Sequence, residues 1–181
     1  MKVVPTLHPA ALMRDPTLWG VVVADLVRAW EESKPVDYTV PEPDIILIEN
    51  VRDIVEILES MPTDEPVAVD LEIVHGRLLC MGLCQTPPLV YVCDGPIVLE
   101  ARTHVQQWLH THSLVFHNAY FDVAELERLG FTVPHWVCTL LLHHTVYSEL
   151  PQGLAFVASV YTRIPYWKHL MKAALGEEMD K

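Results

Sequence analysis

The chain has 181 residues, 51% of them hydrophobic and 20% charged, a composition typical of a soluble globular protein with a sizeable core. Its net charge of −12 argues against a protein that grips duplex nucleic acid through a broad basic surface. An enzyme that meets nucleic acid only at one metal-loaded pocket remains compatible with this charge, because the metal supplies positive charge locally. No apolar run approaches the roughly 20 residues that a membrane span requires, and the N-terminus lacks a signal-peptide pattern, so no membrane contact and a cytoplasmic location are expected.

Residues 1–43 are predicted to form a separate piece. Helical spacing runs from Trp19 to Glu31, and residues 34–43 form an extended linker because their three prolines forbid a helix. The motif Thr-x-His-Pro-Ala-Ala-Leu-x-Arg, which begins at Thr6, resembles the last signature segment of the bacterial and phage-type uracil-DNA glycosylases. That resemblance covers residues 1–33 and assigns His8 to contact with a flipped base. The base pocket and the water-activating motif of a glycosylase are missing, so this activity is not expected.

The rest of the chain, residues 44–181, is predicted to be one α/β domain with a mixed sheet flanked by helices. Three strands joined by short turns form an antiparallel meander, and alternating helices and strands follow. The expected strands are Ile45–Ile48 (short and buried), Val67–Glu72, Leu78–Gln85, Leu89–Cys93, Leu114–Phe116 and Phe131–Val137. The expected helices are Val51–Met61, Ile97–Thr111, a helix that ends at Gly130, Thr139–Val146, Gln152–Tyr161 and Tyr166–Leu175. The tryptophans Trp30, Trp108 and Trp136 are expected in the core.

Two carboxylates stand one residue apart at the end of the apolar strand Val67-Ala68-Val69-Asp70-Leu71-Glu72. Because side chains alternate along a strand, Asp70 and Glu72 are expected on the same side of the sheet. Two adjacent like charges repel each other, and a bound cation offsets that repulsion. The alternative is a strand that simply ends in solvent at Asp70.

A third carboxylate, Asp122, lies at a strand-to-helix junction beside Asn118. Ligand sites in open α/β sheets gather where strands end, so Asp122 is expected near the first pair. Three hard oxygen ligands favour Mg²⁺ or Mn²⁺ in a two-metal site, where one cation generates hydroxide and the other stabilises the leaving oxygen.

Val-Asp-Leu-Glu, followed some fifty residues later by His-Asn-Ala-Tyr-Phe-Asp, resembles the first two motifs of the DEDD superfamily of 3′-5′ exonucleases. The likeness is to the proofreading domain of family A, phage-type DNA polymerases, and it spans about residues 64–175. It implies an RNase H-like (DnaQ-like) exonuclease fold, with Asp70, Glu72 and Asp122 as catalytic metal ligands. It also implies that Leu71, Asn118 and Phe121 bind the last nucleotides of the substrate.

The third motif of that superfamily, Tyr-x-x-x-Asp or His-x-x-x-Asp, does not occur in this sequence. In relatives it supplies a water-orienting side chain and a fourth carboxylate. Substitutes for these two groups are expected near the C-terminus: Glu177, Glu178 or Asp180 as the carboxylate, and His169 or Tyr166 as the water-orienting group.

The leading hypothesis is a metal-dependent 3′-5′ exonuclease that acts on single-stranded or frayed 3′ ends of DNA, with RNA as a second substrate. The alternative is a catalytically impaired module with the same fold that serves as a binding or structural part of a viral replication protein. A viral origin would place it in the host cytoplasm. The sequence leaves the oligomeric state open.

Overall fold

A computed structural model describes residue 4, residues 6–33 and residues 42–162. The chain divides into two compact units: Pro41–Thr139 form one, and Met1–Val40 together with Leu140–Lys181 form the other. Among the described helices, none is long and apolar enough to cross a membrane. The predicted division into a 1–43 segment and a 44–181 exonuclease domain stays a prediction.

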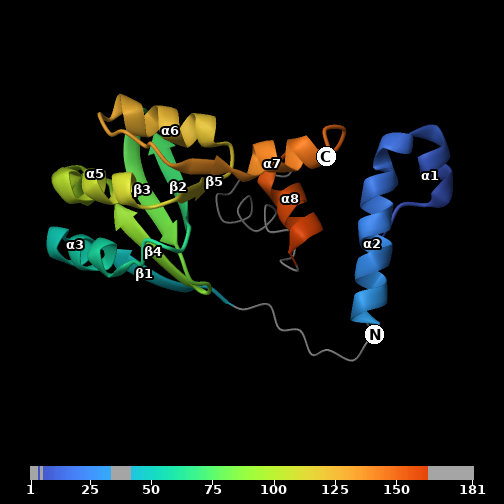
Figure 1. Cartoon of the computed structure of the whole chain (residues 1–181), viewed down its shortest axis with the longest axis horizontal. Helices are drawn as coiled ribbons and strands as arrows, with labels where there is room; N and C mark the ends of the chain where they lie inside the picture. The colour runs from blue at the N-terminus through green and yellow to red at the C-terminus, as the bar shows by residue number, and fades with distance from the viewer. Residues whose placement is uncertain (1–3, 5, 34–41, 163–181) are drawn as a thin grey trace. The chain divides into compact units, whose positions relative to one another are not determined.

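The unit Pro41–Thr139 is built on a six-stranded mixed sheet with the order β1-β4-β3-β2-β5-β6 (Figure 1). The strands are β1 (Asp44–Ile48), β2 (Val67–Val74), β3 (Arg77–Cys84), β4 (Leu89–Asp94), β5 (Leu114–Phe116) and β6 (Trp136–Cys138). Strands β2, β3 and β4 pair antiparallel, whereas β1 joins β4, β5 joins β2 and β6 joins β5 in parallel. This arrangement confirms the predicted meander followed by parallel strands.

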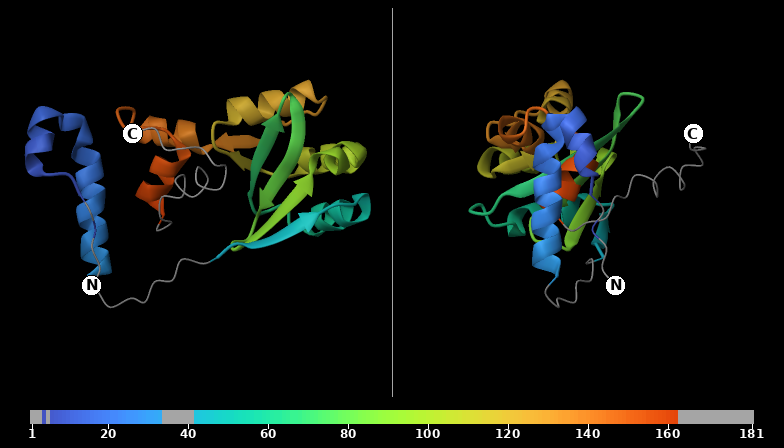
Figure 2. Two further views of the ribbon diagram at one scale, coloured as in Figure 1. Left: turned by 180° about the vertical axis from the view of Figure 1, so that it is seen from behind. Right: turned by 90° about the vertical axis from the view of Figure 1, so that its right-hand side faces the viewer.

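Four helices belong to this unit: α3 (Val51–Ser60), α4 (Gly95–Glu100), α5 (Arg102–Thr111) and α6 (Ala119–Arg128). Helices α3 and α5 lie side by side (Figures 1 and 2). Helix α3 begins where predicted, because the Asn50 side chain accepts a hydrogen bond from the backbone N–H of Asp53 at 2.9 Å and so caps the first turn.

Strand β2 follows the expected alternation. Val67, Val69 and Leu71 are buried on one face, while Asp70 and Glu72 are exposed on the other. The apolar face therefore contributes to the core, and the carboxylates stand on the opposite face.

The hairpin between β2 and β3 turns through His75 and Gly76, whose φ angles are 50° and 74°. Two consecutive positive φ values are the requirement of a two-residue turn that matches the twist of the flanking strands, and glycine adopts them without steric cost. This turn sets the pairing of β2 with β3 as far as Ile73, and the register shift between Glu72 and Ile73 then places Cys80 and Gly82 opposite the carboxylates.

Three sequence predictions are wrong in detail. Residues Asp44 to Leu47 of β1 are exposed rather than buried, because β1 is an edge strand with β4 as its neighbour. The helix predicted over residues 97–111 is two helices, since Ala101 has a ψ of 17° and separates α4 from α5. The strand predicted over residues 131–137 is reduced to Trp136–Cys138, because β5 offers only three residues for pairing.

The other unit contains α1 (Pro9–Arg14), a 3-10 turn η1 (Pro16–Leu18), α2 (Trp19–Glu32), most of α7 (Thr139–Val146) and α8 (Leu154–Tyr161). The Arg28 guanidinium on α2 donates to the carbonyls of Ser159, Val160 and Thr162 at 2.6, 3.0 and 2.9 Å. A cation on the last carbonyls of a helix satisfies otherwise unpaired acceptors and complements the helix dipole. Arg28 thus ties α2 to the end of α8.

The three tryptophans that were expected in the core differ in their burial. Trp108 is 3% exposed, as expected of a core residue. Trp136 is half-buried. The core prediction for Trp30 is wrong, because α2 leaves this side chain 72% exposed.

Candidate active site

The carboxylate pair stands in the middle of the sheet. Asp70 lies opposite Gly82 of β3, and Glu72 lies opposite Cys80, immediately before a register shift between Glu72 and Ile73. Both acids are on the exposed face of β2, which confirms that they share one side of the sheet. Gly82 brings no side chain to the surface beside Asp70, so access to that carboxylate is not crowded from β3.

The third carboxylate reaches the pair because β5 is short. Strand β5 pairs with β2 only at Val67 and Ala68, so the backbone of β2 has no strand partner on that side beyond this point. Helix α6 begins just after β5, and Asp122 in its first turn accepts a hydrogen bond from the Leu71 N–H at 3.3 Å. Asp122 therefore takes the place of the missing strand and comes to lie beside Asp70 and Glu72.

Electrostatics agree with this clustering. The pKa of Asp122 is raised to about 6, first by burial, since the residue is 3% exposed, and then by the Asp70 charge, with a smaller contribution from Glu72. Burial also raises the pKa of Asp70, and the nearby His117 partly offsets this. Repulsion among carboxylates is the condition that a bound cation relieves.

Two side chains near the carboxylates, His117 and Cys80, were not assigned a role in the site from the sequence. The His117 ring is held by Thr139, whose Oγ1 lies 2.9 Å from Nδ1 and donates to the Phe116 carbonyl. Cys80 lies between Glu72 on β2 and Asp94 on β4. Burial raises the pKa of the Cys80 thiol, and the charges of Glu72, Asp70 and Asp94 raise it further. The thiol is therefore poorly reactive. The meander that pairs β3 with β4 was predicted, but the register that sets Cys80 opposite Asp94 was not.

Asn118 and Phe121 lie at the same strand end as Asp122. Asn118 precedes α6 in the left-handed conformation, with φ 66° and ψ 49°, which asparagine tolerates better than most residues. Phe121 is 48% exposed, as a side chain that stacks on a base requires. The Leu71 side chain is 4% exposed on the other face of β2, and it is the backbone of Leu71 that the structure connects to the site. The substrate-binding roles of all three stay predictions.

The carboxylates of Asp70, Glu72 and Asp122 suit a hard divalent cation by their chemistry, but they do not enclose one. All three side chains offer carboxylate oxygens, the ligands that Mg²⁺ and Mn²⁺ prefer. Across residues 4, 6–33 and 42–162, however, no group of three histidine, cysteine, aspartate or glutamate side chains is close enough to enclose a metal ion. A Mg²⁺ site needs only one or two protein carboxylates when substrate phosphate and water complete the coordination. Asp70, Glu72 and Asp122 are the residues that would hold it.

The predicted substitutes for the third motif lie outside the described residues. These are Tyr166, His169, Glu177, Glu178 and Asp180. His8, the residue of the glycosylase-like motif, is described: its Nδ1 accepts a hydrogen bond from the Ala10 N–H at 3.1 Å and so caps α1. A capping role is sufficient to account for His8.

No family model and no curated protein matches the chain. Solved structures do match. The catalytic core of RRP6 from Trypanosoma brucei is similar over 75% of this chain and 40% of its own, with a TM-score of 0.60 and 18% identity. Escherichia coli RNase D, an exoribonuclease involved in structured RNA processing, is similar over 67% of this chain and 34% of its own, with a TM-score of 0.51 and 16% identity.

A protein from Bifidobacterium adolescentis is similar over 65% of this chain and 32% of its own, with a TM-score of 0.52 and 16% identity. At such identities the likeness shows the fold, and it confirms the predicted RNase H-like exonuclease fold. The chain spans well under half the length of these three structures.

Proposed function

We propose that the protein is a divalent-metal-dependent 3′-5′ exonuclease that removes nucleotides from single-stranded or frayed 3′ ends of DNA, with RNA as a second substrate. One observation carries this proposal: the Asp122 carboxylate accepts a hydrogen bond from the Leu71 N–H, between Asp70 and Glu72, and this brings a third carboxylate near the pair on β2. RNA is included because the fold is shared with an exoribonuclease.

The roles of the side chains follow from their positions. Asp70 and Glu72 project from the same face of β2 and would hold a divalent cation there. Asp122 would provide the third carboxylate from α6, with the Leu71 N–H fixing its orientation. When bound, Mg²⁺ or Mn²⁺ supplies Lewis-acid chemistry, which lowers the pKa of water and stabilises the leaving oxygen.

The substrate end is expected to lie beside the first turn of α6. Exposed Phe121 offers a ring on which a terminal base stacks, and Asn118 offers an amide for hydrogen bonds to the nucleotide. The net charge of −12 favours a partner that engages this one site rather than a long basic track.

The alternative proposal is a catalytically impaired module of a viral replication protein, which keeps the fold and binds without cutting. It is supported by the lack of a three-ligand cluster among the described side chains. Binding alone requires the sheet and α6, whereas hydrolysis also requires a well-held cation.

One assay separates the two proposals. A 5′-labelled single-stranded DNA and the RNA of the same sequence are each incubated with Mg²⁺ or Mn²⁺. An exonuclease gives a ladder that shortens from the 3′ end and disappears with Asp70→Ala or with a chelator. Retained binding without a metal-dependent ladder, in several preparations, supports the impaired module and contradicts the exonuclease.

A further inference from the structure

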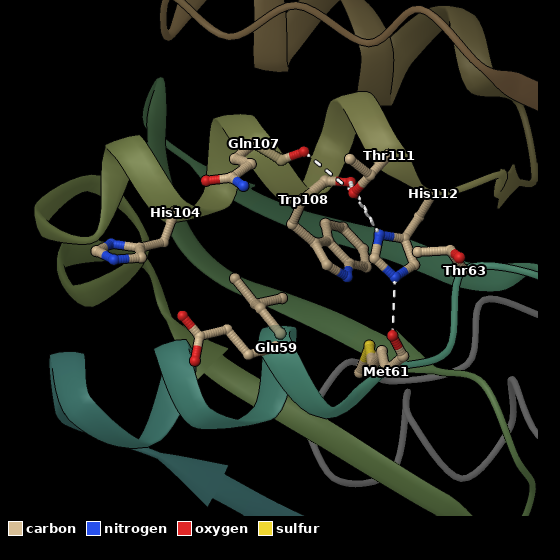
Figure 3. A pocket seen from close by; sticks show the side chains of 9 residues that line it. Glu59, Met61, Thr63, His104, Gln107, Trp108, Thr111 and His112 are labelled. Atoms are coloured by element: carbon tan, nitrogen blue, oxygen red, sulfur yellow. Dashed lines mark hydrogen bonds between the residues drawn. The ribbon is translucent and has the colours of Figure 1, made fainter.

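A cavity of about 170 Å³ lies between α3 and α5, and none of the three site carboxylates lines it (Figure 3). One face of α5 forms its roof, with side chains at the spacing i, i+3, i+4 and i+7. These are His104, Gln107, Trp108 and Thr111. The opposite wall includes Leu58 and Glu59 at the end of α3 and Met61 just beyond it.

The Trp108 indole lines this cavity and carries a buried hydrogen-bond donor that has no partner in the part of the chain that the structure describes. The side chain is 3% exposed, and its Nε1 has no hydrogen-bond partner among the described residues. Figure 3 shows the indole nitrogen on the side of the ring that faces Glu59 and Met61. A buried tryptophan N–H normally has a partner, so an acceptor supplied by a ligand would complete it.

His112 and Thr111, which lie next to the indole, are held in place by ring stacking and hydrogen bonds. His112 stacks on Trp108 with ring centroids 5.1 Å apart, and its Nε2 lies 3.1 Å from the Met61 carbonyl. The Thr111 hydroxyl donates to the Trp108 carbonyl at 3.1 Å. The inner end of the cavity is therefore a preorganised aromatic and apolar surface with one donor, the Trp108 N–H.

The outer end of the cavity is polar. Glu59, His104 and Gln107 are exposed there, and they come from the two facing helices. The Glu59 carboxylate accepts hydrogen bonds from an N–H group and disfavours an anion. An occupant that satisfies both ends presents an acceptor inward and a donor outward, and it carries no negative charge.

The volume sets the size of the occupant. A cavity of roughly 150 Å³ in another protein holds benzene, so about 170 Å³ accepts one six-membered ring. We propose that this cavity binds an uncharged pyrimidine-type ring, whose carbonyl oxygen or ring nitrogen accepts from Trp108 Nε1 and whose N–H group faces Glu59. The site takes the ring from a free base or nucleoside, or from a base within a nucleic acid.

The test uses the full-length protein labelled with ¹⁵N, and with ¹³C in the methionine methyl groups. Uracil is titrated into the protein to millimolar concentrations, the range appropriate for a fragment-sized ligand. The expected result is a saturable shift of the Trp108 indole signal, which is assigned by its loss in Trp108→Phe, and a parallel shift of the Met61 methyl signal. Benzene, which has the same size but no acceptor, is expected to bind at least tenfold more weakly.

Two variants test the hydrogen bonds. Trp108→Phe keeps an aromatic ring but removes the donor, and it is expected to weaken uracil binding about tenfold, read from the Met61 methyl signal. Glu59→Ala, at an exposed position that tolerates change, is expected to weaken it several-fold. Its matched control is Glu56→Ala on the same helix, where the side chain is paired with Arg52 at 2.8 Å and does not line the cavity.

The source of the ring is decided by comparing uracil, uridine and a short pyrimidine oligonucleotide, all with Asp70→Ala protein to prevent hydrolysis. Equal binding of uridine and uracil indicates a free base or nucleoside, and tighter binding of the oligonucleotide indicates a base within a strand. The proposal is overturned if no saturable shift occurs, if benzene binds as tightly as uracil, or if Glu59→Ala and Trp108→Phe both leave binding unchanged. Because the readout is binding, its outcome is independent of whether the protein is a nuclease.

Discussion

The Oδ1 atom of Asp122 lies 3.3 Å from the backbone nitrogen of Leu71, the residue between Asp70 and Glu72. This hydrogen bond joins the first turn of α6 to the middle of β2, across 51 residues of sequence. This contact brings the acidic side chain of α6 near the pair on β2, and the predictions about activity start from it.

Asp122→Asn is expected to reduce nuclease activity on the order of 100-fold while the protein stays folded. The amide oxygen can still accept from the Leu71 N–H, but it cannot supply negative charge to a cation. Steady-state cleavage of a labelled oligonucleotide measures the loss, and circular dichroism checks the fold. Glu127→Gln, on the exposed side of the same helix, is the matched control and is expected to leave activity unchanged. Equal losses in both variants would contradict a specific role for Asp122.

Stability of the metal-free protein is expected to depend on pH through Asp122. Its pKa is about 6 in the folded chain against an ordinary value of 3.8, so the folded state binds the proton more tightly than the unfolded state. The contribution is therefore fully present below pH 4 and is lost as the pH rises through 6. Its size is about 1 to 3 kcal/mol. Urea denaturation in a chelator, compared between wild type and Asp122→Asn, measures it. A difference that does not change between pH 4 and pH 7 would refute the raised pKa.

Divalent cations are expected to stabilise the protein most at a pH above 6, where Asp122 has lost its proton. At a concentration about 100 times the dissociation constant the gain is roughly 2.7 kcal/mol. Thermal unfolding with Mg²⁺, Mn²⁺ or a chelator measures this gain, which is expected to fall in Glu72→Gln. Asp94→Asn is the control, because Asp94 lies on β4, two strands from Glu72, and loses the same charge. If both variants lose the gain equally, the effect is one of general charge rather than of ligation.

Asn118 allows the backbone and the side chain to be tested separately. Because its φ is 66°, Asn118→Gly is expected to keep or slightly raise stability, whereas Asn118→Ala costs about 1 kcal/mol. If the amide binds substrate, both variants raise KM several-fold to a similar extent. Urea denaturation and cleavage kinetics on the same preparations provide the two readouts. An unchanged KM in Asn118→Gly would remove Asn118 from the substrate site.

Gly95→Ala is expected to destabilise the protein by about 2 to 4 kcal/mol. A Cβ atom at this position would lie 2.0 Å from the Leu78 carbonyl oxygen, and that oxygen belongs to a paired strand which cannot easily move. Gly153→Ala is the comparison, since a Cβ atom there meets nothing within 4 Å, and its cost is expected to stay within about 1 kcal/mol. The midpoints of urea denaturation of the two variants are compared. Equal midpoints would contradict the close approach of Gly95 to the Leu78 carbonyl.

Local sequence patterns were sufficient to predict many of the helices and strands of this protein. The alternation of β2 predicts that Asp70 and Glu72 share a face, and the Asn50 cap predicts the start of α3, because both depend on neighbours within a few residues. The same patterns do not reveal the break at Ala101, since one non-helical residue leaves the spacing of seven between buried Val98 and Val105 unchanged.

The remaining features depend on contacts between residues far apart in the sequence. Burial of Ile45 depends on whether its strand is central or at an edge, and β1 proves to be an edge strand. The unpaired Trp108 N–H arises from the packing of α5 against α3, which periodicity cannot express. The reach of Asp122 to Leu71 depends on where β5 stops pairing with β2. The amino-acid sequence specifies which carboxylates are available and which face of β2 two of them share, because alternation along a strand is local. The third carboxylate comes near them only through strand pairing, which is a long-range interaction.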